Sequence, residues 1–341
     1  MYSAIILNDT SYERHHGCVQ VMKAIYEELK RRDIKIVMSV PVGINWENLP
    51  KFEKYILKSD VVIVNGEGTI HDDAKNALDL VKIATYCKAK NIRSVLINAL
   101  IENNSSCIYE HIKNFDLVYV RDSLSKKELL NNNINCTLVP DLSFSRKFKK
   151  PVKRSHQIVI TDSVLSDLTC KLYSFSQTDK RYVYLPIFRS PVVSLNDLLS
   201  PLKLMKYKIR KIWSKLLVTL SFKLSSSQTR LLHELGSTDS YLNQIASSEL
   251  IITGRFHALC FAIKTKTPFI ALKSNSQKME ALLIDLGFDQ NRLLDFQSIN
   301  NTQLEKIFFF TSNELSKINS YLAHTDREIN TMFNKIVALL P

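Results

Sequence analysis

Short apolar runs alternate with segments of helical periodicity through the first 145 residues, and this alternation limits the fold more than any other feature. It favours a mostly parallel sheet with helices on both faces. The predicted strands are Ser3–Leu7, Ile34–Ser39, Val61–Asn65, Arg93–Ala99, Leu117–Arg121 and Cys136–Val139, and the clearest predicted helices are Val19–Arg32, Ala74–Lys88 and Ser123–Leu130.

The pattern stops at a basic linker, Arg146–Arg154, and then starts again. Further strands are predicted at Gln157–Thr161, Tyr182–Pro186, Leu250–Ile252 and Pro268–Leu272, followed by a long helix over Asn313–Leu340. We therefore predict an α/β protein with two Rossmann-like domains, residues 1–150 and 151–312, that face a cleft. The last segment, 313–341, is predicted to be a helix able to cross back over both domains.

The net charge of +13 points to anionic partners such as phosphorylated substrates, nucleic acid or a membrane surface. Nucleic acid is set aside because the basic residues are not interleaved with aromatic ones. The six cysteines form no Cys-x-x-Cys pair and no zinc-spaced cluster with histidine, which predicts reduced thiols, no metal site and a cytoplasmic protein. No apolar run of about 18 residues is present, so no transmembrane span is expected.

Residues 200–230 interrupt the α/β pattern with a basic helical insertion. Apolar residues recur at helical spacing around Trp213, and no acidic residue occurs between Asp197 and Glu234. Such a helix suits peripheral contact with an anionic membrane through residues 202–223, at the inner face of the membrane. The alternative is a surface helix that covers the second domain with solvated lysines.

The segment Gly254-Arg255-Phe256-His257 is the strongest functional signal, because it places a cation and an imidazole where a strand passes into a helix. Unpaired N–H groups at a helix N-terminus attract anions. The next strand leads to Ser274 and Lys278, which are predicted on the same side. This arrangement predicts a phosphorylated or carboxylated substrate, with His257 as proton donor. The alternative is that Arg255 pairs with a buried carboxylate and His257 caps or packs.

Three other strand ends carry polar groups. Gly66-Glu67-Gly68 places an acid between two glycines, where Glu67 can act as a base toward a sugar hydroxyl or be a solvated acid in a tight turn. The first loop presents Asn8, Asp9 and His16 for substrate contact. Arg121 is expected either to bind a ligand or to pair with Asp122 or Asp141.

With these residues in place, the chain resembles the polysaccharide pyruvyl transferase family. The matching segments are Gly66-Glu67-Gly68, Val120-Arg121-Asp122-Ser123, Val139-Pro140-Asp141, Thr253-Gly254-Arg255-Phe256-His257, and Pro268–Leu272 continuing to Ser276-Gln277-Lys278. The resemblance implies a glycosyltransferase B-like arrangement of the two domains, phosphoenolpyruvate as donor substrate, and Arg255 and His257 as donor-binding and acid residues. Its acceptor class is a surface polysaccharide or a lipid-linked oligosaccharide. The first loop and Glu67, which replaces a frequent third glycine, depart from the family pattern.

The sequence thus predicts a transferase that adds a pyruvyl ketal from phosphoenolpyruvate to a sugar and needs no other cofactor. His257 and Glu67 are the expected acid and base. The predicted donor side is the second domain, with Arg255, Gly254, Lys278, Ser274 and also Arg121; the predicted acceptor side is the first, with Asn8, Asp9, His16, Gly66 and Gly68. A glycosyltransferase that uses a nucleotide-activated sugar, and a non-catalytic family member docked on a membrane, remain as alternatives.

Overall fold

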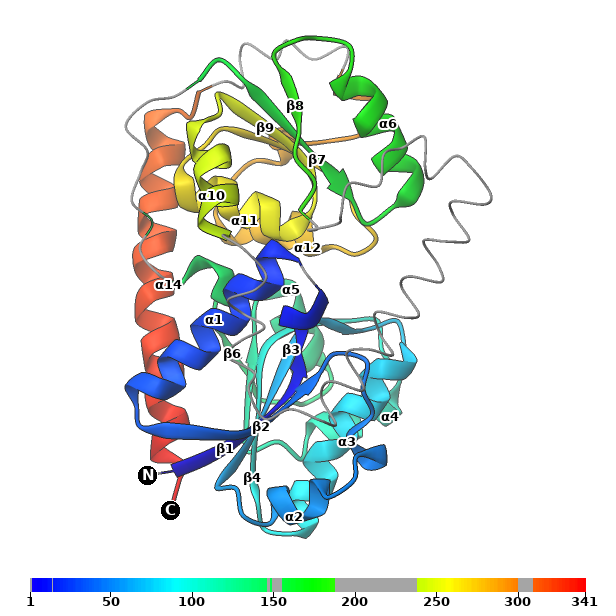
Figure 1. Cartoon of the computed structure of the whole chain (residues 1–341), viewed down its shortest axis with the longest axis vertical. Coiled ribbons are helices and arrows are strands. Elements are labelled where there is room, and N and C mark those ends of the chain that lie inside the picture. Colours follow the sequence, from blue (N-terminus) through cyan, green and yellow to red (C-terminus); the bar gives the residue numbers. More distant parts are fainter. Residues whose placement is uncertain (1, 14, 146–147, 149–154, 188–237, 300–308) are drawn as a thin grey trace.

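The computed structural model describes residues 2–13, 15–145, 148, 155–187, 238–299 and 309–341, which form two lobes (Figure 1). The basic insertion predicted at 200–230 lies outside the described residues, and so does nearly all of the predicted linker. Within the described part of the chain, no helix is both long and apolar enough to cross a membrane.

The first lobe is built on a six-stranded parallel sheet with the strand order β2-β1-β3-β4-β5-β6. Its strands are β1 (Tyr2–Asp9), β2 (Ile34–Pro41), β3 (Val61–His71), β4 (Arg93–Glu102), β5 (Leu117–Val120) and β6 (Thr137–Leu138). Its helices are α1 (His16–Arg31), α2 (Phe52–Ile56), α3 (Lys75–Ala89), α4 (Ser106–Ile112) and α5 (Ser123–Asn131). Successive strand residues point to opposite faces: Ile5 and Leu7 pack toward α3 and α4, and Ala4 and Ile6 pack toward α1.

The second lobe has a five-stranded parallel sheet with the order β11-β10-β9-β7-β8. Its strands are β7 (Ile158–Ser163), β8 (Tyr182–Tyr184), β9 (Leu250–Gly254), β10 (Phe269–Leu272) and β11 (Leu293–Leu294). The described helices are α6 (Ser166–Ser176), α10 (Thr238–Ser247), α11 (Phe256–Thr265), α12 (Lys278–Asp285) and α13 (Phe296–Ile299). Helices α10, α11 and α12 cover one face of the sheet, and α6 and α13 cover the other.

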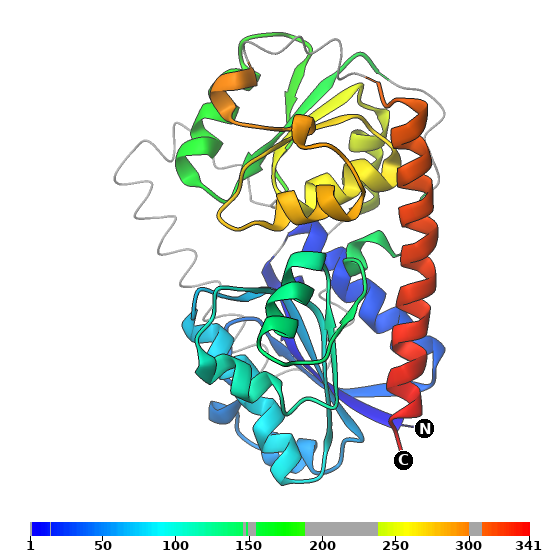
Figure 2. The ribbon, with the colours of Figure 1, turned by 180° about the vertical axis from the view of Figure 1, so that it is seen from behind.

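Helix α14 (Ser312–Ala338) runs along both lobes, as the sequence predicted (Figure 2). It begins with a capping box in which Thr311 and Glu314 satisfy each other's backbone N–H groups. Near this end Ile318 packs in the core of the second lobe, and toward the other end Phe333 packs in that of the first. The two chain ends meet where the Tyr2 hydroxyl donates a 2.9 Å hydrogen bond to the Pro341 carbonyl.

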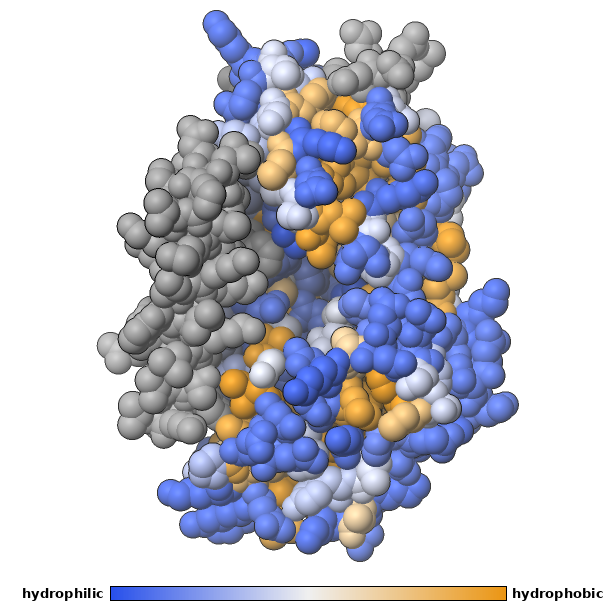
Figure 3. All heavy atoms as spheres, turned by 90° about the vertical axis from the view of Figure 1, so that its right-hand side faces the viewer, coloured by the Kyte–Doolittle hydropathy of each residue, from blue (hydrophilic) through white to orange (hydrophobic). Residues whose placement is uncertain are grey.

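Each sheet has one position at which the strand order reverses, and ligands of open α/β sheets bind at the carboxyl ends of such strands. In the first sheet this position lies between β1 and β3, and in the second it lies between β7 and β9. The residues at these strand ends meet across the lobe boundary. Figure 3 shows a hollow between the lobes with a largely hydrophilic floor. The two switch points therefore define one shared location for a site.

A pair of carboxylates joins the lobes at the facing helices α5 and α12. Asp285, at the end of α12, accepts a 3.1 Å hydrogen bond from the backbone N–H of Ser123, the first residue of α5. In return, Glu102 at the end of β4 accepts 3.3 Å hydrogen bonds from the N–H of Gln277, which precedes α12. Each lobe thus supplies an anion to a helix N-terminus of the other, which is the favourable sign for the helix dipole.

The predicted strand end after Asn65 is wrong, because β3 continues through Gly66 and Gly68 to His71. The strand is irregular there, since its register against β4 shifts between Glu67 and Ile70. A Cβ on Gly66 would lie 2.5 Å from the Cβ of Ala99 on β4. Similarly, a Cβ on Gly254, the last residue of β9, would lie 2.7 Å from the Cβ of Ser163 on β7. Close approach of the neighbouring strand therefore accounts for both glycines.

Candidate active site

Helix α11 begins at the lobe boundary with Arg255 as its N-cap. The guanidinium of Arg255 pairs with the buried Asp162 of β7, with Nε 2.8 Å and Nη2 2.6 Å from Oδ2. The other Asp162 oxygen accepts a 2.9 Å hydrogen bond from the N–H of Ile187. Arg255 therefore has the buried carboxylate partner that the sequence analysis gave as its alternative, and this pair fixes the start of α11.

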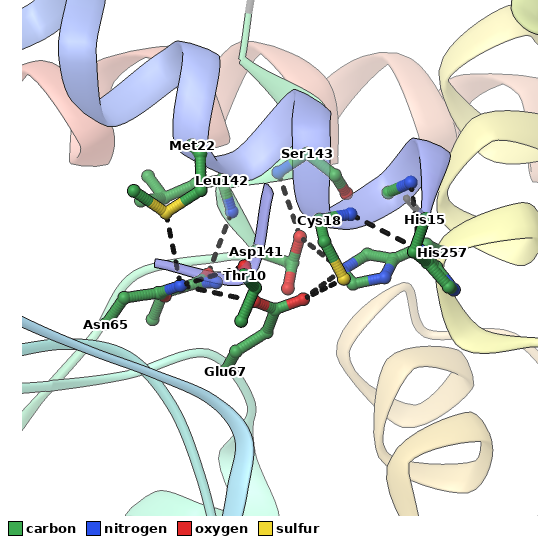
Figure 4. A network of polar contacts seen from close by, with 12 residues as sticks. Thr10, His15, Cys18, Met22, Asn65, Glu67, Asp141, Leu142, Ser143 and His257 are labelled. Atoms are coloured by element: carbon green, nitrogen blue, oxygen red, sulfur yellow. Dashed lines mark hydrogen bonds and ion pairs between the residues drawn. The ribbon is translucent and has the colours of Figure 1, made fainter. Parts of the chain in front are cut away.

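Two residues further on, His257 extends from the second lobe into the first (Figure 4). Its Nε2 lies 3.6 Å from Oε1 of Glu67 and 3.7 Å from Oδ1 of Asp141. The imidazole fits because position 17 in α1 is a glycine: a Cβ there would be 2.1 Å from the His257 Cγ. Carboxylates only accept hydrogen bonds, so the surroundings of Nε2 favour a proton on that nitrogen.

Glu67 is a buried acid and not the solvated one given as an alternative, since it is only 4% exposed. Its Oε1 accepts a 3.0 Å hydrogen bond from the Cys18 thiol, and its Oε2 accepts one of 3.1 Å from Asn65 Nδ2. Burial, followed by the Glu67 carboxylate, raises the pKa of Cys18 well above its usual range, so the thiol keeps its proton and remains a donor. Glu67 thus has a thiol, an amide and an imidazole around its two oxygens.

Three adjacent strands carry a residue in the left-handed region near their carboxyl ends: Asn8 of β1 at φ 64°, Glu67 of β3 at φ 40°, and Asn98 of β4 at φ 55°. Asparagine tolerates this region, but glutamate rarely adopts it. The Asn8 side chain donates to the Asn65 carbonyl at 2.7 Å and to the Thr69 hydroxyl at 3.0 Å. Sparsely populated conformations of this kind cost about 1–3 kcal/mol each and cluster at functional sites.

Asp141 follows β6 and is almost fully buried. Its Oδ1 accepts a 2.8 Å hydrogen bond from the Ser143 N–H, and its Oδ2 lies 3.2 Å from Nη1 of Arg121. Burial alone would raise the pKa of Asp141, but His257, Arg121 and the Ser143 side chain outweigh it and hold that pKa below its usual range. Asp141 is therefore ionised at neutral pH. From the sequence, Asp141 was expected as a partner of Arg121 and as part of a segment that carries the family resemblance.

Arg121 is itself buried and stacks over the Phe256 ring, with its Cζ 4.2 Å from the ring centroid. A Cβ on Gly68 would meet Arg121 Nη2 at an ordinary 3.9 Å, so these two predicted site residues are neighbours. Burial, followed by Arg121 and Arg255, lowers the pKa of Lys278 to about 8. Arg121 of the first lobe and Arg255 of the second thus both act on the charge of Lys278.

In the described part of the chain, the polar side chains that follow β10 contact one another or Asp295, and none of them contacts His257 or Glu67. Lys278 Nζ donates to Asn275 Oδ1 at 2.7 Å, and the Ser274 hydroxyl donates to the same oxygen at 3.2 Å. Lys273, by contrast, is exposed and pairs with Asp295 at 3.4 Å. Ser274 and Lys278 are therefore bridged through one amide at the rim of the lobe.

Two residues predicted to contact the acceptor make protein contacts. The Asp9 carboxylate accepts hydrogen bonds from the Ser11 N–H and from the hydroxyls of Ser11, Tyr26 and Ser39. His16 stacks on Tyr241, with ring centroids 4.4 Å apart. Among the predicted residues, the structure thus gathers Glu67, His257, Arg121 and Gly68 closely, and it places Asp9 and His16 in packing roles around them.

His15 caps helix α1: its Nδ1 accepts hydrogen bonds of 3.1 and 3.3 Å from the N–H groups of Gly17 and Cys18. An accepting Nδ1 places the proton of a neutral imidazole on Nε2. Burial, followed by His257 and Arg255, holds the pKa of His15 well below its usual range, so the ring is neutral. Candidate ligand atoms of His15, Cys18 and His257 lie within 4.8 Å of one another. Binding a metal through Nε2 would require His15 to move its proton and lose this cap.

This geometry can be set beside known proteins. The family model for polysaccharide pyruvyl transferases matches residues 15–276, a span that includes Glu67, Arg121, Asp141, Arg255 and His257. The chain belongs to the polysaccharide pyruvyl transferase family. No curated protein matches it.

Solved structures show the same fold at very low sequence identity. A proposed UDP-N-acetylglucosamine 2-epimerase from Listeria monocytogenes is 10% identical with a TM-score of 0.54, covering 98% of this chain and 96% of that one. An uncharacterized protein from Klebsiella pneumoniae is 10% identical with a TM-score of 0.51, covering 86% and 92%. A trehalose-6-phosphate synthase is 9% identical with a TM-score of 0.50, covering 99% and 98%. The predicted glycosyltransferase B-like arrangement of two α/β domains is thereby confirmed.

As a polysaccharide pyruvyl transferase family member, the protein is a transferase enzyme. The family match places the Gly-Arg-x-His block within the shared sequence. The structure adds that this block meets Glu67 and Asp141 across the lobe boundary.

Proposed function

We propose that this enzyme transfers the pyruvyl group of phosphoenolpyruvate to a saccharide and leaves it there as a cyclic ketal. The observation that carries the proposal is the 3.6 Å approach of His257 Nε2 to Glu67 Oε1, beside the cations Arg121, Arg255 and Lys278. The imidazolium form of histidine can donate a proton near neutral pH, and a carboxylate can receive one. The family match supports the choice of pyruvyl transfer.

The donor carries a phosphate and a carboxylate, so its site needs several fixed cations. Arginine binds such groups through its planar guanidinium, and lysine acts as a point charge. We assign Arg255, Lys278 and Arg121 to these anions, with Gly254 and Ser274 lining the same rim. The +13 net charge favours approach of a multiply charged donor.

In the proposed reaction, His257 protonates the methylene carbon of phosphoenolpyruvate, and positive charge develops at the carbon that bears the phosphate. One sugar hydroxyl adds to that carbon while Glu67 takes its proton. Phosphate then leaves, and a second hydroxyl of the same sugar adds in its place. The proton of this second hydroxyl goes to the departing phosphate, and the two new C–O bonds form the ketal. Removing a group that stabilises the developing charge is expected to slow the reaction on the order of 100-fold or more.

Substrates cannot reach these groups in the conformation described, because the side chains of His257, Glu67 and Asp141 are each less than a tenth exposed. The site lies at the boundary between two lobes, so we infer that the lobes separate to admit substrate. The Glu102 and Asp285 contacts are candidates for what breaks when they do.

The acceptor is proposed to lie on the first lobe, near Asn8, Gly68 and Glu67, and to be a surface polysaccharide or lipid-linked oligosaccharide. Asp9, His16 and Gly66 would shape this side indirectly, through the packing described above. For a lipid-linked acceptor, the basic segment 202–223 would hold the enzyme at the cytoplasmic face of the membrane. This part of the proposal rests on the charge pattern of the sequence.

The first test is thermal stabilisation by phosphoenolpyruvate, measured beside a panel of nucleotide sugars. A ligand at about 100 times its dissociation constant adds roughly 2.7 kcal/mol to the unfolding free energy. We expect stabilisation of the wild type and its loss in Arg255→Gln, which keeps an amide next to Asp162. Arg93→Gln is the matched control, since Arg93 pairs with Asp116 at the opposite, amino end of β4. A response only to a nucleotide sugar would replace pyruvyl transfer with glycosyl transfer.

A further inference from the structure

Two carboxylates face His257 Nε2, and they are held very differently. Each oxygen of Asp141 has a fixed partner, the Ser143 N–H for Oδ1 and Arg121 for Oδ2. Glu67 has a longer side chain, and the partners of its two oxygens, the Cys18 thiol and the Asn65 amide, are neutral. The Asp141 carboxylate is therefore held in place, and the Glu67 carboxylate is the one able to move.

The backbone around Asp141 explains this rigidity. Asp141 caps the short 3-10 helix η3 (Leu142–Phe144), and the N–H of Leu142 donates a 3.0 Å hydrogen bond to Oδ1 of Asn98. Asn98 is one of the left-handed residues at the sheet edge. The Lys264 ammonium of α11 also donates to the Ser143 carbonyl at 3.1 Å. Lys264 of α11 and Asn98 of β4 thus hold the same segment.

We propose that Asp141 is a positioning residue: it fixes the ring of His257 across the lobe boundary with a proton on the ring nitrogen Nε2. Glu67 remains the base that takes the proton of the sugar hydroxyl. This deepens the function proposed above and rests on it for the role of His257 as acid. Arg121 acts through Asp141 as well as toward the donor, because one guanidinium nitrogen holds the carboxylate that faces the imidazole.

The charges around Asp141 and Glu67 give the two carboxylates different roles. Asp141 is paired with a cation and buried at 1% exposure, so it keeps its negative charge and is a poor proton acceptor. Glu67 has neutral donors, Asn65 and Cys18, at hydrogen-bond distance. It can therefore gain a proton without breaking an ion pair with arginine. The closing of the lobes brings His257 between these two acids, which couples lobe closure to the orientation of the acid.

The test compares Asp141→Asn with Asp122→Asn in the full-length protein. Asparagine keeps the shape and an oxygen for the Ser143 N–H but removes the charge. Asp122 is an equally buried carboxylate, caps α5 and does not face His257, and asparagine is also a good N-cap. Both variants are expected to fold, which thermal unfolding checks.

The first readout needs no substrate. Nitrogen-15 NMR of histidine-labelled protein reports which ring nitrogen carries the proton, and a His257→Asn variant assigns the signals. We expect a protonated Nε2 in the wild type and in Asp122→Asn, and a partly or fully unprotonated Nε2 in Asp141→Asn. Unchanged His257 signals in Asp141→Asn would overturn the proposal, whatever the enzyme transfers.

The second readout is kinetic. With phosphoenolpyruvate and an active acceptor, we expect Asp141→Asn to lower kcat at least 10-fold while the KM for phosphoenolpyruvate changes less than threefold. Asp141→Glu should recover part of this loss, because it restores the charge at a shifted position. A rise in KM alone would assign Asp141 to donor binding and contradict the positioning role. Absence of turnover in the wild type would count against pyruvyl transfer, and the NMR result would still decide the role of Asp141.

Discussion

Replacing Gly17 by alanine tests whether the imidazole of His257 depends on the empty space beside α1. The added Cβ would lie 2.1 Å from Cγ, 2.2 Å from Cβ and 2.4 Å from Nδ1 of His257. Carbon atoms in contact lie about 3.5–4.0 Å apart, so either the ring or the helix must move by more than about 1 Å. The clashing atoms include the Cβ and Cγ of His257, which lie close to its backbone. A change of rotamer in this buried side chain therefore cannot relieve the clash.

Two opposing terms set the change in stability. Alanine favours a helix over glycine by about 1 kcal/mol, and overpacking a tight site costs about 1–3 kcal/mol. We therefore expect the unfolding free energy of Gly17→Ala to fall by at most about 2 kcal/mol. Activity should suffer far more, because a misplacement of about 1 Å can cost on the order of 100-fold in rate. Urea unfolding and kcat for pyruvyl transfer measure the two effects.

A double-mutant cycle with His257→Gly isolates the collision. His257→Ala would not serve, because the Cβ of residue 257 is itself one of the atoms struck. In the His257→Gly background, the alanine at position 17 should lose its penalty and stabilise the protein. If Gly17→Ala alone raised the unfolding free energy and kept normal kcat, the contact between α1 and His257 would not control the site.

Three further predictions concern charge, lobe closure and strain. Because the pKa of Lys278 is lowered to about 8, its ammonium group loses its charge as pH rises through 8. Phosphoenolpyruvate binding, measured by calorimetry, should therefore weaken above that pH. Lys278→Arg should remove this pH dependence of binding. Glu102→Ala combined with Asp285→Ala removes the two carboxylates that join the lobes, Glu102 of β4 to Gln277 and Asp285 of α12 to Ser123. Small-angle X-ray scattering should then show a larger radius of gyration without ligand. An unchanged radius would mean that other contacts keep the lobes closed. Asn98→Ala should cost about 2–4 kcal/mol in urea unfolding, since it loses the hydrogen bond to Leu142 and leaves alanine at φ 55°; a cost below about 1 kcal/mol would contradict this reasoning.

The fold could be predicted because its signals are local. Apolar runs such as Val61–Asn65 and the periodic segment 313–340 fix the class of each element without reference to distant residues. The Gly254–His257 block was found for the same reason, since a strand end, a glycine and a helix start are adjacent in the sequence. The sequence could also place Glu67 at a sheet edge.

The contacts between the lobes could not be predicted, because they join residues far apart in the sequence. Nothing near Asp141 indicates that it will face His257, and nothing near Gly17 indicates that it must be empty for the same ring. The glycines were misread for a related reason: Gly66 accommodates Ala99 of a neighbouring strand, and a sequence does not show how closely two strands approach. The choice between Asp122, Asp141 and a ligand for Arg121 likewise needed the tertiary structure.

Helix α14 has a consequence for how the protein is made. Ile329, Phe333 and Ile336, near the end of the chain, fill the core of the first lobe beside Ala4, Ile6 and Ile25. A ribosome adds about 5–20 residues per second, so the first lobe waits for tens of seconds with part of one apolar face of its sheet uncovered. The nascent first lobe is therefore a candidate for chaperone binding during synthesis, and a truncation after residue 150 should give an aggregation-prone fragment and not a stable domain.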